Sequence, residues 1–363
     1  MHRGAWFVAT VAAGCALAVA GCGDDDSGSS SGGGGGGDKE AGKVAVLLPD
    51  SKSSVRWETV DRPFLKKAFD DAGVESEIQN AEGDKSTQQQ QAEQAITNGA
   101  KVLLLVNLDS GSGAAIAANA KSQGVKVIDY DRLTLKGDSD YYVSFDNEKV
   151  GKLQGEGLVN CLGDKSKPAV AVLNGSPTDN NATLFAKGYN SVIKPKFDSG
   201  DWTKVDDQSV PDWDNQKALQ IFEQMLAKTN NKINAVAAAN DGLANAVISA
   251  LKQRHLPMIP VTGQDATDQG LQHILAGEQC MTVYKAVKKE ADAASALAIS
   301  LIKGGKPKGI NGKSFDGTRQ VPSVLLTPVA VTKSNIASTV IKDKYTTWAK
   351  ICVGAYKKYC PKH

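Results

Sequence analysis

The chain has 363 residues, and its 42 Lys and Arg side chains almost balance its 40 Asp and Glu, which gives a formal net charge of +2. No basic run or basic stripe is present, and this argues against a nucleic-acid-binding protein. About 320 residues follow the N-terminal segment described next, more than a single core usually serves, so two lobes are expected.

The first residues have the pattern of a secretory signal. Arg3 precedes an apolar run over 5–20, which is shorter than the ~20 residues that a membrane-spanning helix needs. The run leads into Gly21-Cys22, with small residues directly before a cysteine. This motif predicts cleavage before Cys22 and attachment of a lipid to its thiol. An ordinary signal peptide followed by an incidental cysteine is the alternative.

The segment after Cys22 has the composition of a tether. Residues 23–38 are Gly, Ser and Asp only, including six consecutive glycines. Such a segment has no apolar surface to bury and is typical of a flexible linker. We therefore predict a lipoprotein signal peptide over 1–21 and an acylated cysteine with its linker over 22–42. The folded part would be extracytoplasmic and lipid-anchored to the outer face of a bacterial cell membrane.

The rest of the chain alternates short apolar runs with longer amphipathic stretches. In chain order the first set is strand 44–48, helix 57–72, strand 75–79, helix 86–98, strand 102–106, helix 113–123, strand 126–130 and strand 142–145. The second set is helix 147–160, strand 169–173, helix 182–193, strand 203–207, helix 215–228, strand 235–239, helix 243–253, strand 260–263, helix 267–275, strand 281–284 and helix 286–303. Apolar strands joined by helices predict parallel sheets covered on both faces. The fold class is therefore α/β, with two doubly wound lobes.

Four cysteines remain after Cys15 is removed with the signal and Cys22 is acylated. An even number in an oxidising compartment suggests two disulfides. Cys352 and Cys360 are close in sequence and are paired here, which leaves Cys161 with Cys280; free buried thiols are the alternative. Metal binding is not expected, because the sequence has no CxxC motif and no histidine cluster.

Polar and aromatic side chains gather after the predicted strands. In open parallel sheets, ligands bind outside the carboxyl ends of the strands. These positions hold Arg56 and Trp57, Asp131 and Arg132, residues 176–181, Asn240 and Asp241, Gln264 and Asp265, and Lys285, and Trp213 adds a second indole. Carboxylates, amides and cations suit a polyol, whose hydroxyls both donate and accept hydrogen bonds, and indole faces suit the C–H faces of a pyranose. Taken singly, an Asp or Asn after a strand more often caps a helix, and a lone Trp is more often core.

Six segments resemble the xylose-binding proteins of the type I periplasmic-binding family, relatives of ribose- and galactose-binding proteins. They are residues 129–132, 142–151, 175–182, 263–266, 281–285 and 321–328. The resemblance extends over about 43–343. It implies ten candidates for contact with a monosaccharide: Arg56, Trp57, Asp131, Arg132, Asp179, Asn181, Trp213, Asn240, Asp265 and Lys285. It implies D-xylose as the ligand, with D-glucose as the main rival. The sequence departs from the family pattern in the 49–55 loop, at Asp241-Gly242-Leu243, and in a cysteine-containing tail over 344–363. These departures concern the fine specificity for the sugar and the surface that contacts the partner.

The resemblance also implies the lobes and the mode of action. One lobe would be 43–146 plus 284–327 and the other 148–282 plus 329–343, with three crossings near 145–149, 283–285 and 327–329. The lobes would close over the sugar, and the permease subunits of an ABC importer would recognise the closed form. No cofactor and a monomeric state are expected.

A sugar sensor and an enzyme are the two alternative classes of function. A sugar sensor for a chemoreceptor or histidine kinase would use the same site. An enzyme with Asp131 and Asp265 as an acid/base pair is disfavoured, because Arg132 and Lys285 would hold both carboxyls ionised.

Overall fold

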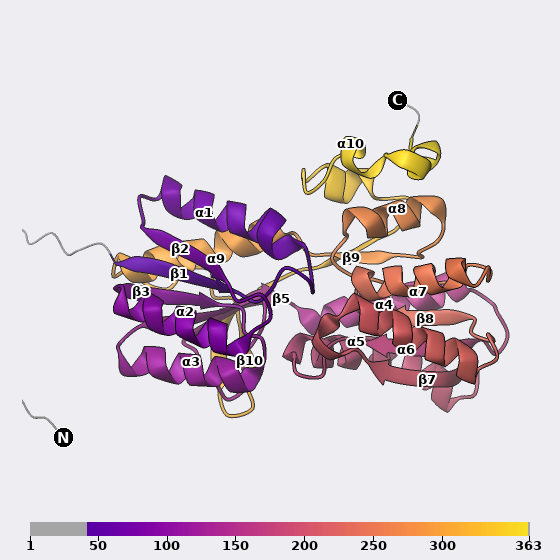
Figure 1. Cartoon of the computed structure of the whole chain (residues 1–363), viewed down its shortest axis with the longest axis horizontal. Coiled ribbons are helices and arrows are strands. Elements are labelled where there is room, and N and C mark those ends of the chain that lie inside the picture. The colour runs from indigo at the N-terminus through magenta and orange to yellow at the C-terminus, as the bar shows by residue number, and fades with distance from the viewer. Residues whose placement is uncertain (1–41, 362–363) are drawn as a thin grey trace, which may run out of the picture. The chain divides into compact units, whose positions relative to one another are not determined.

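A computed structural model of the chain describes residues 42–361 (Figure 1). The predicted signal peptide, Cys22 and most of the linker lie outside these residues. Within 42–361, no helix has the length and apolar character needed to cross a membrane.

A seven-stranded sheet has the order β10-β11-β5-β4-β3-β1-β2. All its neighbours are parallel except β10, which runs antiparallel to β11 at the edge. The strands are β1 (Lys43–Leu48), β2 (Ser76–Asn80), β3 (Ala100–Leu105), β4 (Lys126–Tyr130), β5 (Tyr141–Phe145), β10 (Gly312–Phe315) and β11 (Gln320–Leu326). The sequence predicted the first five; the last two were not predicted as strands.

Alternation along β1 places its side chains in two separate cores, one on each face of this sheet. Val44, Val46 and Leu48 pack with α1 and α9, whereas Ala45 and Leu47 pack with α2 and α3. The helices are α1 (Arg62–Asp71), α2 (Lys85–Thr97), α3 (Ser110–Ser122) and α9 (Val287–Ile302). Burial on both faces explains why β1 is a continuous apolar run.

A second, three-stranded parallel sheet has the order β7-β6-β8. Its strands are β6 (Ala169–Asn174), β7 (Thr203–Ser209) and β8 (Ala235–Ala238), and its helices are α4 (Asn147–Leu162), α5 (Asn180–Asp198), α6 (Asn215–Lys228) and α7 (Asp241–Gln253). These elements share one apolar core. The two parallel sheets covered by helices confirm the predicted fold class.

The strand predicted over 260–263 is wrong in extent. This segment forms a single parallel bridge between Val261 and Val236 of β8. Pro257 and Pro260 flank the bridge, and proline has no N–H to donate to a longer ladder.

A small antiparallel pair joins β9 (Thr282–Tyr284) to β12 (Val329–Val331), next to the crossings predicted near 283–285 and 327–329. The chain then continues through η3 (Ala337–Ile341), α10 (Trp348–Ile351) and η4 (Gly354–Tyr359). These last elements lie against α8 (Asp268–Ala276), as Figure 1 shows. The bounds given above for the two lobes stay a prediction.

Both expected cysteine pairs lie within bonding distance. The structure joins Cys161 to Cys280 and Cys352 to Cys360, with Cα–Cα distances of 6.3 and 6.0 Å, inside the usual range for a disulfide. We predict that non-reducing mass spectrometry of the secreted protein will detect both linked peptides. Labelling of these cysteines by a thiol reagent without prior reduction would contradict the assignment.

Candidate ligand-binding site

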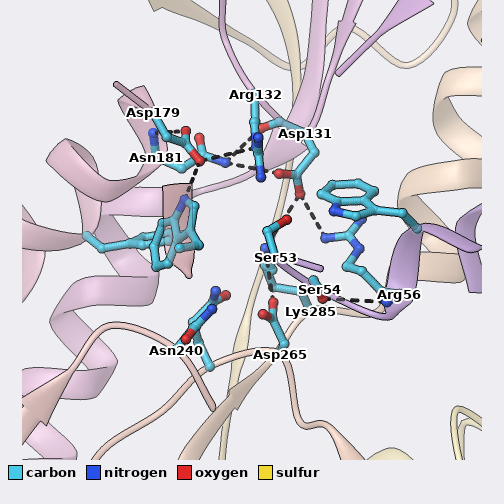
Figure 2. Close-up of a pocket in the computed structure, with 14 residues that line it drawn as sticks. Ser53, Ser54, Arg56, Asp131, Arg132, Asp179, Asn181, Asn240, Asp265 and Lys285 are labelled. Atoms are coloured by element: carbon cyan, nitrogen blue, oxygen red, sulfur yellow. Dashed lines mark hydrogen bonds and ion pairs between the residues drawn. The ribbon is translucent and has the colours of Figure 1, made fainter. Parts of the chain in front are cut away.

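All ten candidates line one pocket (Figure 2). Four further residues line it that were not among the candidates: Ser53, Ser54, Phe185 and Gln264. The two serines belong to the 49–55 loop, where Asp50 accepts a hydrogen bond from the Ser53 hydroxyl at 2.7 Å. Gln264 follows the predicted strand 260–263 directly, so its strand-end position indicated it, although the family resemblance does not place it among the sugar contacts. Phe185 lies inside a helix, so no strand end marked it.

Nine of the ten candidates lie just after a strand or strand-like segment or at the start of a helix, and Trp213 ends the 3-10 helix η2 (Pro211–Trp213). Asp131 directly follows β4 and Lys285 directly follows β9. Asp179 caps α5, accepting from the Asn181 N–H at 2.9 Å, and Asn240 caps α7, accepting from the Leu243 N–H at 2.8 Å. Helix capping and a place in the pocket are therefore compatible for the same side chain.

Arg56 is the centre of a buried ion cluster beneath the pocket. Its guanidinium donates to Asp61 at 2.8 and 2.9 Å, to Asp131 at 2.8 Å and to Glu290 at 2.7 Å. The four side chains are between 0 and 5% exposed. Neither Asp61 nor Glu290 was predicted as a site residue from the sequence. Glu290 could have been noticed as an acid on the face of the predicted helix 286–303 that also carries Val287 and Ala294.

The buried position of Glu290 predicts a pH dependence of stability. Burial and the charge of Asp131 raise the pKa of Glu290 to about 8, in spite of Arg56. An unfolded Glu has a pKa of about 4.3, so between these values the folded state binds the proton that the unfolded state has lost. The contribution of Glu290 to the unfolding free energy is thus complete below about pH 4 and lost as the pH rises through about 8.

We expect denaturant titrations to show the unfolding free energy falling between about pH 5 and about pH 8.5, with a smaller slope in Glu290→Gln. Asp129 and Asp241, whose pKa values burial raises to about 7, act in the same direction in both proteins. Equal slopes for the parent and the variant would contradict the assignment to Glu290.

Asp131 links this cluster to the pocket. Its carboxylate lies 3.5 Å from the Lys285 ammonium, which is 3.4 Å from Asp265. Burial acts to raise the pKa of Asp131, but Lys285, Arg56 and Arg132 outweigh it and hold that pKa well below its usual value. Asp131 is therefore an ionised acceptor at neutral pH. This state suits hydrogen bonding and does not suit a general acid.

Arg132, Asp179 and Trp213 form the opposite wall. The Arg132 Nε lies 3.1 Å from an Asp179 carboxylate oxygen, and the Trp213 indole N–H donates to the same oxygen at 3.0 Å. Gly175 lies directly beneath the Trp213 ring, where a Cβ would clash with the indole. Trp57 differs from the expectation of a free apolar face, because the guanidinium carbons of Arg56 and Arg132 lie 4.4 and 5.6 Å from its ring centroid. It lines the pocket as part of a cation–π stack.

The pocket has uncommon backbone geometry and unused polar atoms. Asp131, Trp213 and Asp265 have φ values of +64°, +55° and +98°, a region that costs about 1–3 kcal/mol for residues other than glycine. Such residues tend to cluster where a site is held in a fixed shape. Among the described residues, Trp57 Nε1 and Gln264 Oε1 are buried without a hydrogen-bond partner. Both belong to residues that line the pocket.

The fold and this pocket between sheet ends are those of a solute-binding protein. Residues 44–306 match the model of the periplasmic binding protein domain. The chain belongs to this family, whose members bind solutes and are not enzymes.

Named relatives agree with this class. The chain is 40% identical over 304 residues to the D-xylose-binding periplasmic protein of Escherichia coli, covering 84% of this chain and 90% of that one. A solute-binding protein from Clostridium phytofermentans with bound β-D-glucose superposes with a TM-score of 0.79 at 31% identity, covering 85% and 99%. A carbohydrate-transporter binding protein from Chloroflexus aurantiacus in complex with D-glucose gives 0.78 at 30% identity, covering 85% and 97%.

Proposed function

We propose that this protein binds a monosaccharide, D-xylose before others, and delivers it to the permease of an ABC importer. The observation that supports this most is the convergence of Arg132, Asp131, Asp179, Asp265 and Lys285, all buried, in one pocket. A pocket lined by the fourteen residues named above suits one sugar ring better than an oligosaccharide.

The chemistry of the lining favours a neutral polyol over a charged ligand. Its cations already have carboxylate partners: Arg132 pairs with Asp179, and Lys285 lies between Asp131 and Asp265. An anionic ligand would compete with these carboxylates. Hydroxyl groups can instead bond to the remaining lone pairs and N–H groups, at about 0.5–1.5 kcal/mol for each neutral bond and more when a partner is charged.

Delivery would follow from closure of the two predicted lobes on the ligand. Polar contacts already join the elements of the two sheets: Asn181 of α5 donates to the Asp131 carbonyl at 3.0 Å and to the Asp131 carboxylate at 3.1 Å. A bound sugar would add bonds to both sides of the cleft and favour the closed form. The permease would then need to recognise only that form.

A calorimetric sugar panel tests the proposal directly. We expect D-xylose to bind, D-glucose to be its main competitor, and L-arabinose and D-ribose to bind at least about tenfold more weakly. A misplaced hydroxyl leaves a buried partner unpaired, which costs about 1–3 kcal/mol. Discrimination against glucose depends on the space for its extra hydroxymethyl group. No heat with xylose or glucose, together with tight binding of another ligand, would overturn the choice of sugar.

We propose further that Cys22, which lies outside the described residues, carries the lipid anchor. The support is the small-residue motif before it and the Gly/Ser/Asp tether after it. We expect the mature protein to partition into the detergent phase, and Cys22→Ala to be found in the aqueous phase or the medium. A Cys22→Ala protein that stays membrane-bound would contradict the anchor.

A further inference from the structure

The Asp265 backbone adopts a conformation that its neighbours have to hold. Its φ is +98° and that of Ala266 is +52°, and such values persist when surrounding contacts impose them. The Asp265 N–H donates to the Val283 carbonyl at 2.8 Å, and the Ala266 N–H donates to the Thr282 hydroxyl at 3.2 Å. These two bonds fix the N–H side of the turn to β9.

A residue of the C-terminal tail binds the other side of the same turn. The Tyr345 hydroxyl donates to the Asp265 carbonyl oxygen at 3.1 Å. Its ring packs on Tyr284, with centroids 5.1 Å apart, and Tyr284 directly precedes Lys285. Tyr345 therefore touches the backbone of one partner of the Asp265–Lys285 ion pair and the neighbour of the other partner.

The tail that carries Tyr345 is itself fastened to α8. Gln272 of α8 donates to the Ile351 carbonyl at 3.1 Å. Ile351 is fully buried in an apolar cluster that also contains Ala266, and both cysteines of the Cys352–Cys360 disulfide pack against that cluster. The tail, α8 and the turn at Asp265 thus form one packed unit.

We propose that Tyr345 is a positioning residue of the ligand site, and that the disulfide-closed tail over 344–360 holds it in place. This inference rests on the sugar-binding role proposed above. The Tyr345 hydroxyl fixes the Asp265 peptide so that the carboxylate faces Lys285 and the pocket. Loosening the tail lets that peptide relax toward ordinary φ values, which withdraws the carboxylate from the ligand.

The test compares Tyr345→Phe with Tyr359→Phe, the same change at an exposed tyrosine of the same tail. We expect Tyr345→Phe to weaken D-xylose binding about threefold to tenfold in calorimetry, the value of one hydrogen bond. Tyr359→Phe should leave it unchanged. A double variant, Cys352→Ser with Cys360→Ser, should weaken binding in the same direction because it frees the tail.

A measurement made without ligand tests the role of Tyr345 independently of which sugar the protein binds. Hydrogen exchange of the Asp265 and Ala266 amides should be faster in Tyr345→Phe than in the parent and in Tyr359→Phe, while exchange in β6 stays the same. If the parent binds no sugar of the panel, the proposed function fails, and the exchange rates alone decide the role of Tyr345. Unchanged exchange at Asp265 and Ala266, or unchanged affinity for a bound sugar, would overturn the inference.

Discussion

We expect Asp265→Ala to weaken D-xylose binding by roughly a hundredfold or more, to below detection by calorimetry. Asp265 is 7% exposed and its carboxylate lies 3.4 Å from Lys285. Removing it deletes a charged acceptor for the sugar and leaves Lys285 in a dry cleft with Asp131 as its remaining acidic neighbour. Removing one member of a buried, charged set costs far more than removing a surface pair.

The matched control for this variant is Asp292→Ala. Asp292 is about half exposed on α9 and pairs with Lys288 across one helical turn, so its loss should change neither affinity nor the circular dichroism spectrum. We expect Arg132→Ala to weaken D-xylose binding to a similar degree as Asp265→Ala, because it removes the cation that pairs with Asp179 on the opposite wall. An Asp265→Ala protein that binds D-xylose within about tenfold of the parent, where the parent itself binds, would refute a direct role for this carboxylate.

We expect Arg56→Ala to lower the unfolding free energy by about 3–5 kcal/mol, the cost of breaking a buried ion pair from one side. Arg56 is 3% exposed, and its removal leaves Asp61, Asp131 and Glu290 without their shared cation. Denaturant titration measures the loss, and Arg62→Ala is the control. Arg62 pairs with Glu58 but is about one-third exposed, so its loss should cost about 1 kcal/mol.

Arg56→Lys gives a second measurement should Arg56→Ala fail to fold. Lysine keeps the charge, but it lacks the planar fork that reaches three carboxylates at once. We expect an intermediate loss of stability and weaker sugar binding, because Asp131 would lose its fixed orientation. A loss in Arg56→Ala no larger than that in Arg62→Ala would contradict the cluster's contribution.

Much of the fold follows from local patterns in the sequence. The apolar runs predicted strands such as β1, β3, β4, β6 and β8, and the flanking amphipathic stretches predicted most helices within a few residues. β2 and β7 were also predicted, although both are largely polar. The edge strand β10 and its neighbour β11 were not predicted, because Gly312–Phe315 is half polar and β11 contains Pro322. Pro322 is tolerated because the register of β11 with β5 begins only at Ser323.

The sequence by itself determined which side chains end the strands, and these line the pocket together because parallel strands end at one edge. Only the tertiary structure decided what holds them. Glu290 is 234 residues from Arg56, and Tyr345 is 80 residues from Asp265. The hydrophobic periodicity of a sequence shows only whether a position is buried or exposed. It does not show which distant residue contacts that position. Which distant residue makes the contact depends on the order of the strands and on the packing of α9 and the tail. A buried charge or a strained peptide is stable only where such a partner is present.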